Sequence, residues 1–293
     1  MMKQNKSNIF ISGSTGFIGN HLKKYLRKKN YSLITPNKKT LNLKNKYLLK
    51  KFLNKKKPKI IIHLASSTNF NNNKISENKN QFSNTFLITK NLIDSINRDC
   101  NFLIFFGSIE EYGKIKTPFK ETSNVKPFSY YGKYKNLSLK YLEKYTIKNK
   151  INYVWIRPSL TYGQNDNKQR FLGYIFDSIK NNKKIFIKNG NQFRDFLYID
   201  DLCKIINLLI KNHNKKFNTI LNISSQNYIK LSSIPKIIEK IIKKKIYYNV
   251  RTNANSKINL LNSNKKLLTL FPNLKFTDFD KGLTKTLKKE GII

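Results

Sequence analysis

One stretch near the N-terminus decides the fold: Asn8-Ile9-Phe10-Ile11-Ser12-Gly13-Ser14-Thr15-Gly16-Phe17-Ile18-Gly19. Its first part is a short apolar run of the kind found in buried strands, and its second part holds three glycines at three-residue spacing. From Gly16 to about Lys29 the pattern is that of a helix. The stretch therefore predicts a strand, a tight glycine turn and a helix in direct succession.

Short apolar runs alternate with longer amphipathic segments through the first half of the chain. We expect strands at residues 31–35, 59–63, 102–106 and 153–156, and helices over about 81–97 and 129–148. This alternation is typical of a parallel sheet with helices on both faces. The expected fold is α/β, a Rossmann-type doubly wound parallel sheet with a smaller, interleaved C-terminal domain. We place the sheet domain in residues 1–165, to which 195–224 return, and a mainly substrate-binding region in 166–293.

The composition is strongly basic, with 58 Lys plus Arg against 16 Asp plus Glu and a formal net charge of +42. Such a charge attracts polyanions at low salt, but nucleic-acid readers favour arginine, and nearly all the excess here is lysine. Lysine is spread along the chain together with other residues of A- and T-rich codons, so compositional drift explains the balance. We expect no specific nucleic-acid partner, and clusters such as Lys55-Lys56-Lys57 are expected to be solvated turns.

Two further features bound the class of protein. The chain contains no run of about 18 apolar residues, and the stretch at residues 8–11 is too short for a signal peptide. Cys100 and Cys203 are the only cysteines, and neither belongs to a CxxC motif. We therefore expect a cytoplasmic protein with no membrane segment, disulfide framework or metal site.

The glycine turn has a chemical interpretation. In a dinucleotide site the first glycine makes the tight turn, the second lets backbone amides approach the pyrophosphate, and the third allows helix and strand to pack closely. The helix N-terminus adds about half a positive charge. The spacing here is GxxGxxG rather than GxGxxG, and a glycine turn selected for packing alone is the alternative.

The end of the second predicted strand bears on which dinucleotide binds. An acidic residue there holds the ribose hydroxyls of NAD, whereas a basic one suits the 2′-phosphate of NADP. The chain has Thr35-Pro36-Asn37-Lys38-Lys39 at this place, with two lysines and no carboxylate. This favours NADP over NAD.

A tyrosine and a lysine form a second candidate constellation. Tyr131 and Lys135 lie four residues apart and share one face of the helix predicted at 129–148. An unperturbed tyrosine has a pKa of about 10, but a cation a few ångströms away stabilises phenolate and moves the pKa toward neutrality. Ser108 follows the strand at 102–106, where its hydroxyl could bind the same substrate oxygen. Lysine is so common here that a chance Tyr-x-x-x-Lys pair is the alternative.

These motifs together resemble the extended short-chain dehydrogenase/reductases, in particular the NAD(P)-dependent nucleotide-sugar epimerase/dehydratase/reductase family. The resemblance includes Gly107-Ser108-Ile109-Glu110-Glu111-Tyr112-Gly113 and covers nearly the whole chain. The matching segments are residues 11–19, 63–65, 107–113, 131–135, 157–163, 190–201 and 274–283.

The resemblance implies an enzyme that works at C4 of a nucleotide-linked sugar. Tyr131 would move the hydroxyl proton, Lys135 would also hold the nicotinamide ribose, and Ser108 would orient the C4 oxygen. Ser108, Glu110 and Arg194 would contact substrate, with Arg194 on the diphosphate. A homodimer built on the helices at 81–97 and 129–148 is also implied. The implied cofactor-binding residues are Gly13, Thr15, Gly16, Phe17, Ile18, Gly19, Asn37, Lys38, Asn42, Leu43, Leu64, Ala65, Tyr131, Lys135 and Pro158.

Departures from the family pattern keep alternatives open. Asn42 stands where the family has an acidic adenine contact, and Leu160 replaces an asparagine that contacts substrate phosphate. Glu110 occupies the position of the base of the dehydratases, but its neighbour Ile109 replaces their acid. We therefore favour a 4-keto-sugar reductase or a 4-epimerase, with a 4,6-dehydratase as an alternative. A non-catalytic member of the fold that senses the dinucleotide or binds RNA or protein is the other alternative.

Overall fold

The computed structural model describes residues 8–66, 75–252 and 258–293, and the side chains of residues 75–82 lie outside this description. The chain forms two compact units, each built from separate segments. Unit 1 runs up to Gly113 and includes Val125–Arg157 and Cys203–Leu221; unit 2 consists of Lys114–Asn124, Pro158–Leu202 and Asn222–Ile293. The sequence limits of 1–165 and 166–293 were drawn by ligand role, and they stay a prediction.

A six-stranded sheet organises the first part of the chain. Its strands are β1 (Ile9–Ser12), β2 (Leu33–Ile34), β3 (Ile60–His63), β4 (Phe102–Phe106), β5 (Asn152–Pro158) and β9 (Thr219–Ile223). They lie in the order β2-β1-β3-β4-β5-β9, and the pairs from β2 to β5 are parallel. The chain leaves β1 toward β2 and then returns to β3 on the other side, so the topological switch lies between β1 and β3.

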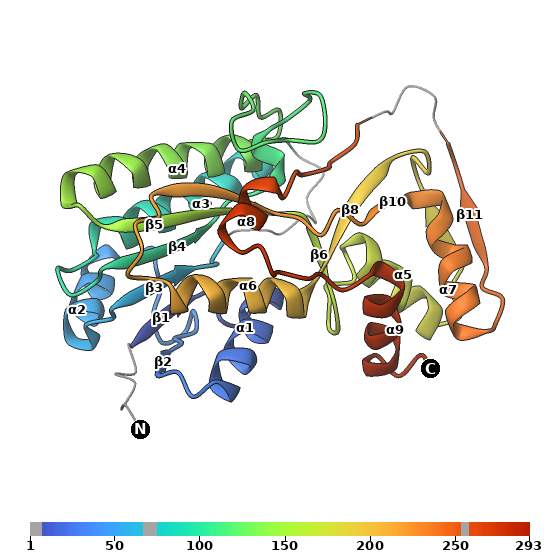
Figure 1. The fold of residues 1–293 in the computed structure, drawn as a ribbon, viewed down its shortest axis with the longest axis horizontal. Helices are drawn as coiled ribbons and strands as arrows, with labels where there is room; N and C mark the ends of the chain where they lie inside the picture. The colour runs from blue at the N-terminus through green and yellow to red at the C-terminus, as the bar shows by residue number, and fades with distance from the viewer. Residues whose placement is uncertain (1–7, 67–74, 253–257) are drawn as a thin grey trace. The chain divides into compact units, whose positions relative to one another are not determined.

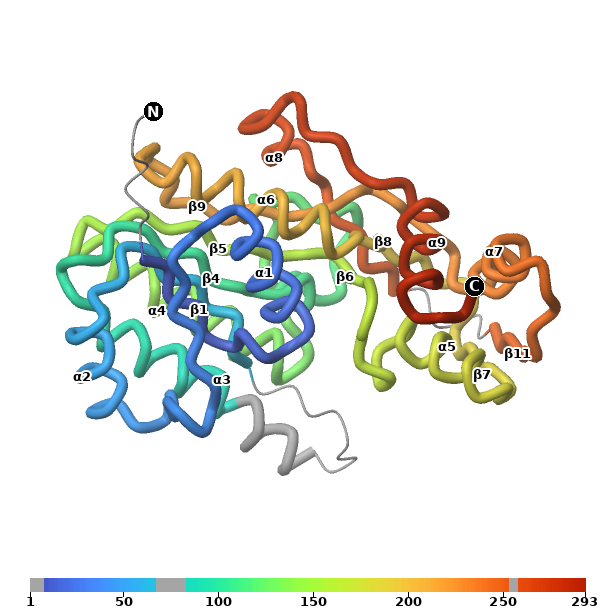
Figure 2. Tube along the Cα trace, turned by 90° about the horizontal axis from the view of Figure 1, so that it is seen from below, coloured from blue at the N-terminus to red at the C-terminus, as the bar shows by residue number. Residues whose placement is uncertain are grey.

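Helices cover both faces of this sheet, which confirms the predicted parallel sheet with flanking helices. They are α1 (Phe17–Lys28), α2 (Lys46–Lys56), α3 (Ile75–Asp94), α4 (Tyr130–Asn149) and α6 (Ile199–Lys211), with a 3₁₀ turn η1 (Ile109–Glu111). Figure 1 shows α3 and α4 over one face and α1 and α6 over the other. The view from below in Figure 2 brings α1 and α6 in front of the strands.

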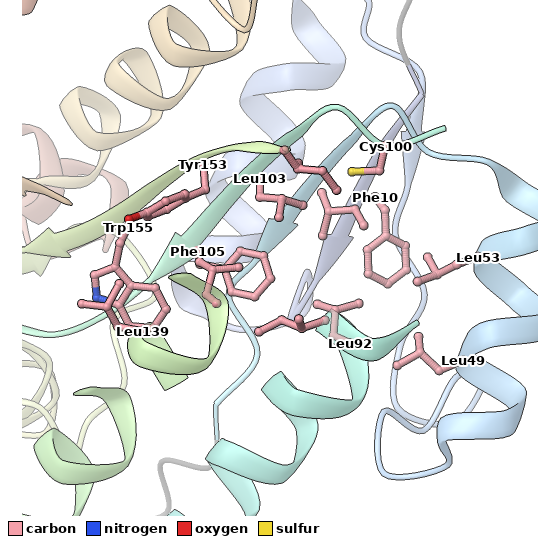
Figure 3. Packing of buried hydrophobic residues seen from close by; sticks show 14 of the residues in the cluster. Phe10, Leu49, Leu53, Leu92, Cys100, Leu103, Phe105, Leu139, Tyr153 and Trp155 are labelled. Carbon is pink, nitrogen blue, oxygen red and sulfur yellow. The ribbon is translucent and has the colours of Figure 1, made fainter. Parts of the chain in front are cut away.

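The central strands are mainly apolar because both of their faces are packed. β3 reads Ile-Ile-Ile-His and is buried at all four positions. On one face, Phe10, Leu103, Phe105 and Trp155 join side chains of α2, α3 and α4 in a single apolar cluster (Figure 3). Each large side chain that is fully buried contributes about 1.5–3 kcal/mol to folding.

Helix α2 corrects one expectation. Lys55 and Lys56 are not in a solvated turn but form the last turn of α2, and only Lys57, in the left-handed region, ends the helix. The helix forms because Leu49 and Leu53 supply a buried stripe. Its terminal lysines also lie at the negative end of the helix dipole, where cations are stabilising.

Unit 2 contains two smaller sheets, a three-stranded one in the order β10-β8-β6 and a parallel pair of β11 and β7. Their strands are β6 (Leu160–Tyr162), β7 (Ile185–Ile187), β8 (Phe193–Tyr198), β10 (Tyr228–Lys230) and β11 (Tyr248–Val250). The helices are α5 (Phe171–Lys180), η2 (Leu231–Ser233), α7 (Ile234–Ile242), α8 (Lys265–Leu270) and α9 (Phe279–Lys289). Tyr162, Phe196 and Phe279 pack ring against ring in its core.

Across the part of the chain that the structure describes, every helix is either too short or too polar to cross a lipid bilayer. The cytoplasmic location stays a prediction.

A carboxylate at the end of α3 links three helices of unit 1. Asp94 accepts hydrogen bonds from Lys46 of α2 at 2.7 Å, from Lys90 of its own helix at 2.8 Å and from the Tyr141 hydroxyl of α4 at 2.6 Å. Partial burial alone would raise the pKa of Asp94, but these three donors outweigh it and hold the pKa at about 2. The ionised form is therefore the one that folding favours.

We expect Asp94→Asn to lower the free energy of unfolding by about 1–2 kcal/mol at pH 7, because hydrogen bonds to a charged group are lost. The folded-state pKa lies below the ordinary value of 3.8, so the carboxylate stabilises above about pH 4 and this contribution is lost as the pH falls toward 2. Urea unfolding of both proteins from pH 7 to pH 3 measures it. Asp278→Asn is the control, because its pair with Lys281 is exposed and should contribute little. Equal stability losses in the two variants would contradict the prediction.

Candidate functional site

The strands of the large sheet end at one level. Ser12 of β1 pairs with His63 of β3, and His63 pairs with Phe105 of β4. The segments that begin at Gly13, Leu64 and Gly107 therefore leave the sheet from the same edge. In open parallel sheets this carboxyl edge, at the topological switch, is where ligands bind.

The glycine turn is closed by its own backbone and lies against the segment after β3. Gly13 has a φ of +72°, and a Cβ there would lie 2.6 Å from the Ala65 backbone nitrogen and 2.9 Å from the Leu64 carbonyl carbon. A Cβ at Gly19 would lie 2.1 Å from the Gly13 carbonyl oxygen. The Gly16 N–H donates to that same oxygen at 3.1 Å. Only glycine fits at Gly13 and Gly19, so backbone meets backbone at the switch point.

The N-terminus of α1 is open to an anion. Its N-cap, Gly16, makes no side-chain hydrogen bond, and the first turn carries no acidic residue. Thr15 and Gly16 are exposed, and Phe17 and Ile18 are partly exposed. An uncapped helix start with about half a positive charge, next to a glycine turn, fits the pyrophosphate of a dinucleotide.

The loop after β2 holds the other predicted cofactor residues. The Asn37 side-chain oxygen accepts the backbone N–H groups of Lys39 and Thr40 at 2.9 and 3.0 Å, and the Asn42 oxygen accepts that of Lys44 at 3.1 Å. Both asparagines therefore shape the loop that they occupy. Lys38 is exposed, while Leu43 packs partly against the core cluster.

His63 is a packed residue at this edge. Its Nδ1 lies 2.6 Å from the Ser12 Oγ, its Nε2 lies 2.9 Å from the Thr89 Oγ1, and its ring packs against Phe105. Burial, with a further contribution from the charge of Lys135, lowers the pKa of His63 well below its ordinary value of 6.5. The imidazole is therefore neutral and links β1 to α3.

The ammonium of Lys135 lies inside unit 1 next to the end of β4. Its Nζ donates to the Phe106 carbonyl oxygen at 2.7 Å and lies 5.7 Å from the centre of the Tyr131 ring. The side chain is only 2% exposed. Burial lowers the pKa of Lys135 from 10.5 to about 8, although the charge of Glu111 opposes this shift. A cation is thus held beside the tyrosine ring at the edge where β4 ends.

The turn that carries Ser108 is tied to the start of α4. The Ser108 Oγ accepts the N–H of Glu110 at 3.2 Å, and the Glu110 carboxylate accepts the Ser129 hydroxyl at 2.6 Å. Ser129 in turn caps α4 by accepting the N–H of Gly132 at 3.0 Å. A Cβ at Gly132 would lie 2.5 Å from the Glu110 carbonyl oxygen, so the helix start packs directly on the turn.

The structure therefore gathers most of the predicted site in unit 1. The Lys135 ammonium donates to the carbonyl oxygen of Phe106, two residues before Ser108. The Glu110 carbonyl, two residues after Ser108, packs against Gly132, which follows Tyr131 in the chain. Gly13, Leu64 and Ala65 lie at the same sheet edge. The chemical role of each of these residues stays a prediction.

Glu111 is a buried charge that the sequence analysis did not single out as a site residue. Its carboxylate accepts the Ser108 N–H at 2.7 Å and pairs with Arg157 at 2.8 Å, and it is 0% exposed. Two adjacent glutamates in a chain with only 16 acidic residues were the available signal. Arg157, the partner of Glu111, lies 46 positions away, which no local pattern reveals.

The two remaining predicted residues begin or belong to unit 2. Pro158 is the last residue of β5 and is partly exposed. Arg194 in β8 donates through one terminal nitrogen to the carbonyl oxygens of Phe193 and Ile258 at 2.9 and 2.8 Å, and through the other to the Gln192 side chain. Burial lowers the pKa of Arg194 below its ordinary value. Its guanidinium is thus held in a defined orientation.

Comparison with known proteins accounts for this arrangement. The sequence pattern of the "NAD dependent epimerase/dehydratase family" matches residues 9–224. The chain belongs to this family. The family resemblance drawn from the motifs is confirmed, and so is the expectation of an enzyme.

Individual relatives span the family's activities. The chain is 31% identical to the GDP-6-deoxy-D-talose 4-dehydrogenase of Aggregatibacter actinomycetemcomitans over 217 residues, 69% of each chain. The GDP-mannoheptose C4 reductase MlghC of Campylobacter jejuni, solved with NADP, has a TM-score of 0.84 at 20% identity and 99% coverage of both chains. The UDP-glucuronic acid 4-epimerase of Bacillus cereus, in complex with UDP-glucuronic acid and NAD, has a TM-score of 0.84 at 19% identity, covering 97% and 99%. At these identities the two structures show the shared fold.

The family's glycine turn gives a sharp test. We expect Gly19→Ala to lose binding of NADPH and NADH, because its Cβ would lie 2.1 Å from a backbone oxygen that cannot move aside. Gly16→Ala is the matched control, because the atom nearest to the added Cβ would be 3.5 Å away, an ordinary van der Waals contact. The Gly16→Ala variant should therefore keep the wild-type melting temperature. Fluorescence titration with each dinucleotide and thermal melting measure both effects. Unchanged binding by Gly19→Ala would show that the turn does not form as described.

Proposed function

We propose that this enzyme carries out NAD(P)-dependent oxidoreduction at C4 of a nucleotide-linked sugar, as a 4-keto-sugar reductase or a 4-epimerase. The observation that carries the proposal is the buried ammonium of Lys135, bonded to the Phe106 carbonyl and next to the Tyr131 ring. It lies at the sheet edge that also carries the glycine turn. A buried lysine is costly, and the burial that lowers the pKa of Lys135 marks it as a functional candidate.

Each residue has a specific task in this proposal. The Tyr131 hydroxyl gives a proton to the C4 oxygen or removes one from it, and Ser108 hydrogen-bonds the same oxygen to orient it. Lys135 stabilises the phenolate that forms when the proton leaves. A bound nicotinamide supplies or accepts the hydride at C4.

The dinucleotide would lie across the switch point. The amides of residues 15–19 would face its pyrophosphate, and Leu64, Ala65 and Pro158 would line its path. We propose NADP as the preferred form, because the loop after β2 presents Lys38 to solvent and contains no carboxylate. Solved neighbours include one with NADP and one with NAD, so the preference rests on this loop alone.

The substrate class follows from the relatives and from Arg194. The relatives act on GDP- and UDP-linked sugars, so a sugar nucleotide is the substrate class proposed here. Arg194 is proposed to bind the diphosphate, because a guanidinium of fixed orientation offers several donors to phosphate oxygens. We also propose a homodimer through α3 and α4, where Leu87 and Leu137 are 40% and 43% exposed.

Two observations count against dehydration. The Glu110 carboxylate is already hydrogen-bonded to Ser129, which caps α4. Ile109 supplies no acid beside it. A reductase or epimerase needs neither group, since proton transfer at the C4 oxygen is the task of Tyr131.

The test is turnover of a panel of UDP-, GDP-, CDP- and dTDP-sugars and their 4-keto forms, with NADPH or NADH. Net consumption of NADPH identifies a reductase, whereas isomerisation without consumption identifies an epimerase. Tyr131→Phe should lower kcat by about 100-fold or more, since the proton-transfer group is lost. It should leave dinucleotide binding within about twofold.

Tyr145→Phe is the matched control, because this tyrosine also lies on α4 but its hydroxyl donates to the Ile96 carbonyl oxygen at 3.3 Å, and it should keep wild-type kcat. Undiminished turnover by Tyr131→Phe would overturn the catalytic role of the phenol. Absence of turnover on every sugar, together with intact dinucleotide binding, would instead favour a non-catalytic member of the fold.

A further inference from the structure

We infer that Glu111 is a positioning residue: its carboxylate fixes the turn that carries Ser108 against β5. The inference rests on the proposed function for the task of Ser108. Glu111 itself is fully buried and does not need to touch substrate.

The first set of contacts runs from Glu111 to the Ser108 turn. The Ser108 N–H donates to Glu111 Oε1 at 2.7 Å, and together with the Ser108 side chain this forms a reciprocal cap of η1. The Ser108 Oγ also accepts the Glu110 N–H. The backbone of Ser108 therefore has one defined position, and the hydroxyl is held at the sheet edge.

The second set of contacts runs from Glu111 to β5. Arg157 reaches Oε2 with Nε at 2.9 Å and Nη2 at 2.8 Å, and the Trp155 indole N–H donates to Oε1 at 3.1 Å. Trp155 is stacked beside Phe105 in the apolar cluster (Figure 3), and Arg157 lies 4.5 Å from the centre of the Tyr112 ring. The anchoring groups are thus themselves fixed by packing.

Gly107 shows how tightly this cluster is closed. A Cβ at Gly107 would lie 2.1 Å from the Trp155 indole nitrogen and 2.2 Å from Glu111 Oε1. The residue before Ser108 must therefore be glycine because the carboxylate and the indole already fill the space. The result is one closely packed cluster, made of Gly107, Ser108, Glu111, Trp155 and Arg157.

Stability alone does not account for this cluster. A buried ion pair is often no more stabilising than apolar side chains of similar volume, because desolvation of both charges is costly. Glu111 has a second effect that an apolar residue would lack, since its negative charge favours the protonated form of Lys135. Glu111 therefore acts on Ser108 by holding its turn and on Lys135 through its negative charge.

The experiment compares Glu111→Gln and the double variant Glu111→Leu/Arg157→Met with wild type. Glu143→Gln is the control, because this carboxylate of α4 is likewise bonded to β5, through the Tyr153 hydroxyl at 3.3 Å, but does not contact the Ser108 turn. In Glu111→Gln we expect amide hydrogen exchange at Ser108 to accelerate about 10-fold or more, from loss of a hydrogen bond to a charged acceptor.

On a sugar found by the panel, kcat of Glu111→Gln should fall about 10- to 100-fold while KM stays within about twofold. The pH above which activity declines should also move lower, because Lys135 loses a favourable charge.

The double variant removes both charges at once, so it should fold and keep a melting temperature near that of wild type. It should still show fast exchange at Ser108 and low kcat. Wild-type exchange and kcat in the folded double variant would overturn the inference. If wild-type protein turns over no nucleotide sugar, the proposed function fails, and the exchange rate at Ser108 still decides whether Glu111 positions the turn.

Discussion

The site depends on one constraint, a lysine ammonium buried at the end of a strand. Lys135 is only 2% exposed. Its protonated form is stabilised there by the hydrogen bond to the Phe106 carbonyl and by the negative charge of Glu111. Burial of an unpaired ammonium would be far more costly. Glu111, which helps to keep this charge, also fixes how the Ser108 turn lies, and its neighbour Glu110 bonds to Ser129, which caps α4.

The parallel sheet makes this arrangement possible. Strands β1, β3 and β4 end at one level. The three segments that follow them therefore leave the same edge of the sheet: the glycine turn, the Leu64–Ala65 segment and the Ser108 turn. Glycines at 13, 107 and 132 each permit a contact that a Cβ would prevent. At Gly13 and Gly132 the glycine lets two backbone segments pack directly against each other, and at Gly107 it leaves room for the Trp155 and Glu111 side chains.

Local sequence patterns predicted the parts that have local causes. The apolar runs at β3 and β4, the glycine turn and the i, i+4 pair in α4 follow from burial on both sheet faces, backbone sterics and helix period. Helix α2 was missed because its lysines mask a stripe of only a few leucines, and β2 proved to be two residues long rather than five. The ion pair of Glu111 with Arg157 could not be predicted, since it joins positions that only the folded sheet brings together.

The most direct test of this account is a pH titration of the lysine side chains by NMR, with Lys135 assigned from the signal missing in Lys135→Arg. The account predicts that the Lys135 ammonium titrates with a pKa of about 8, well below the ordinary value of 10.5. Titration of Lys135 together with the surface lysines near 10.5 would contradict it, because the ammonium would then be in water rather than beside Phe106.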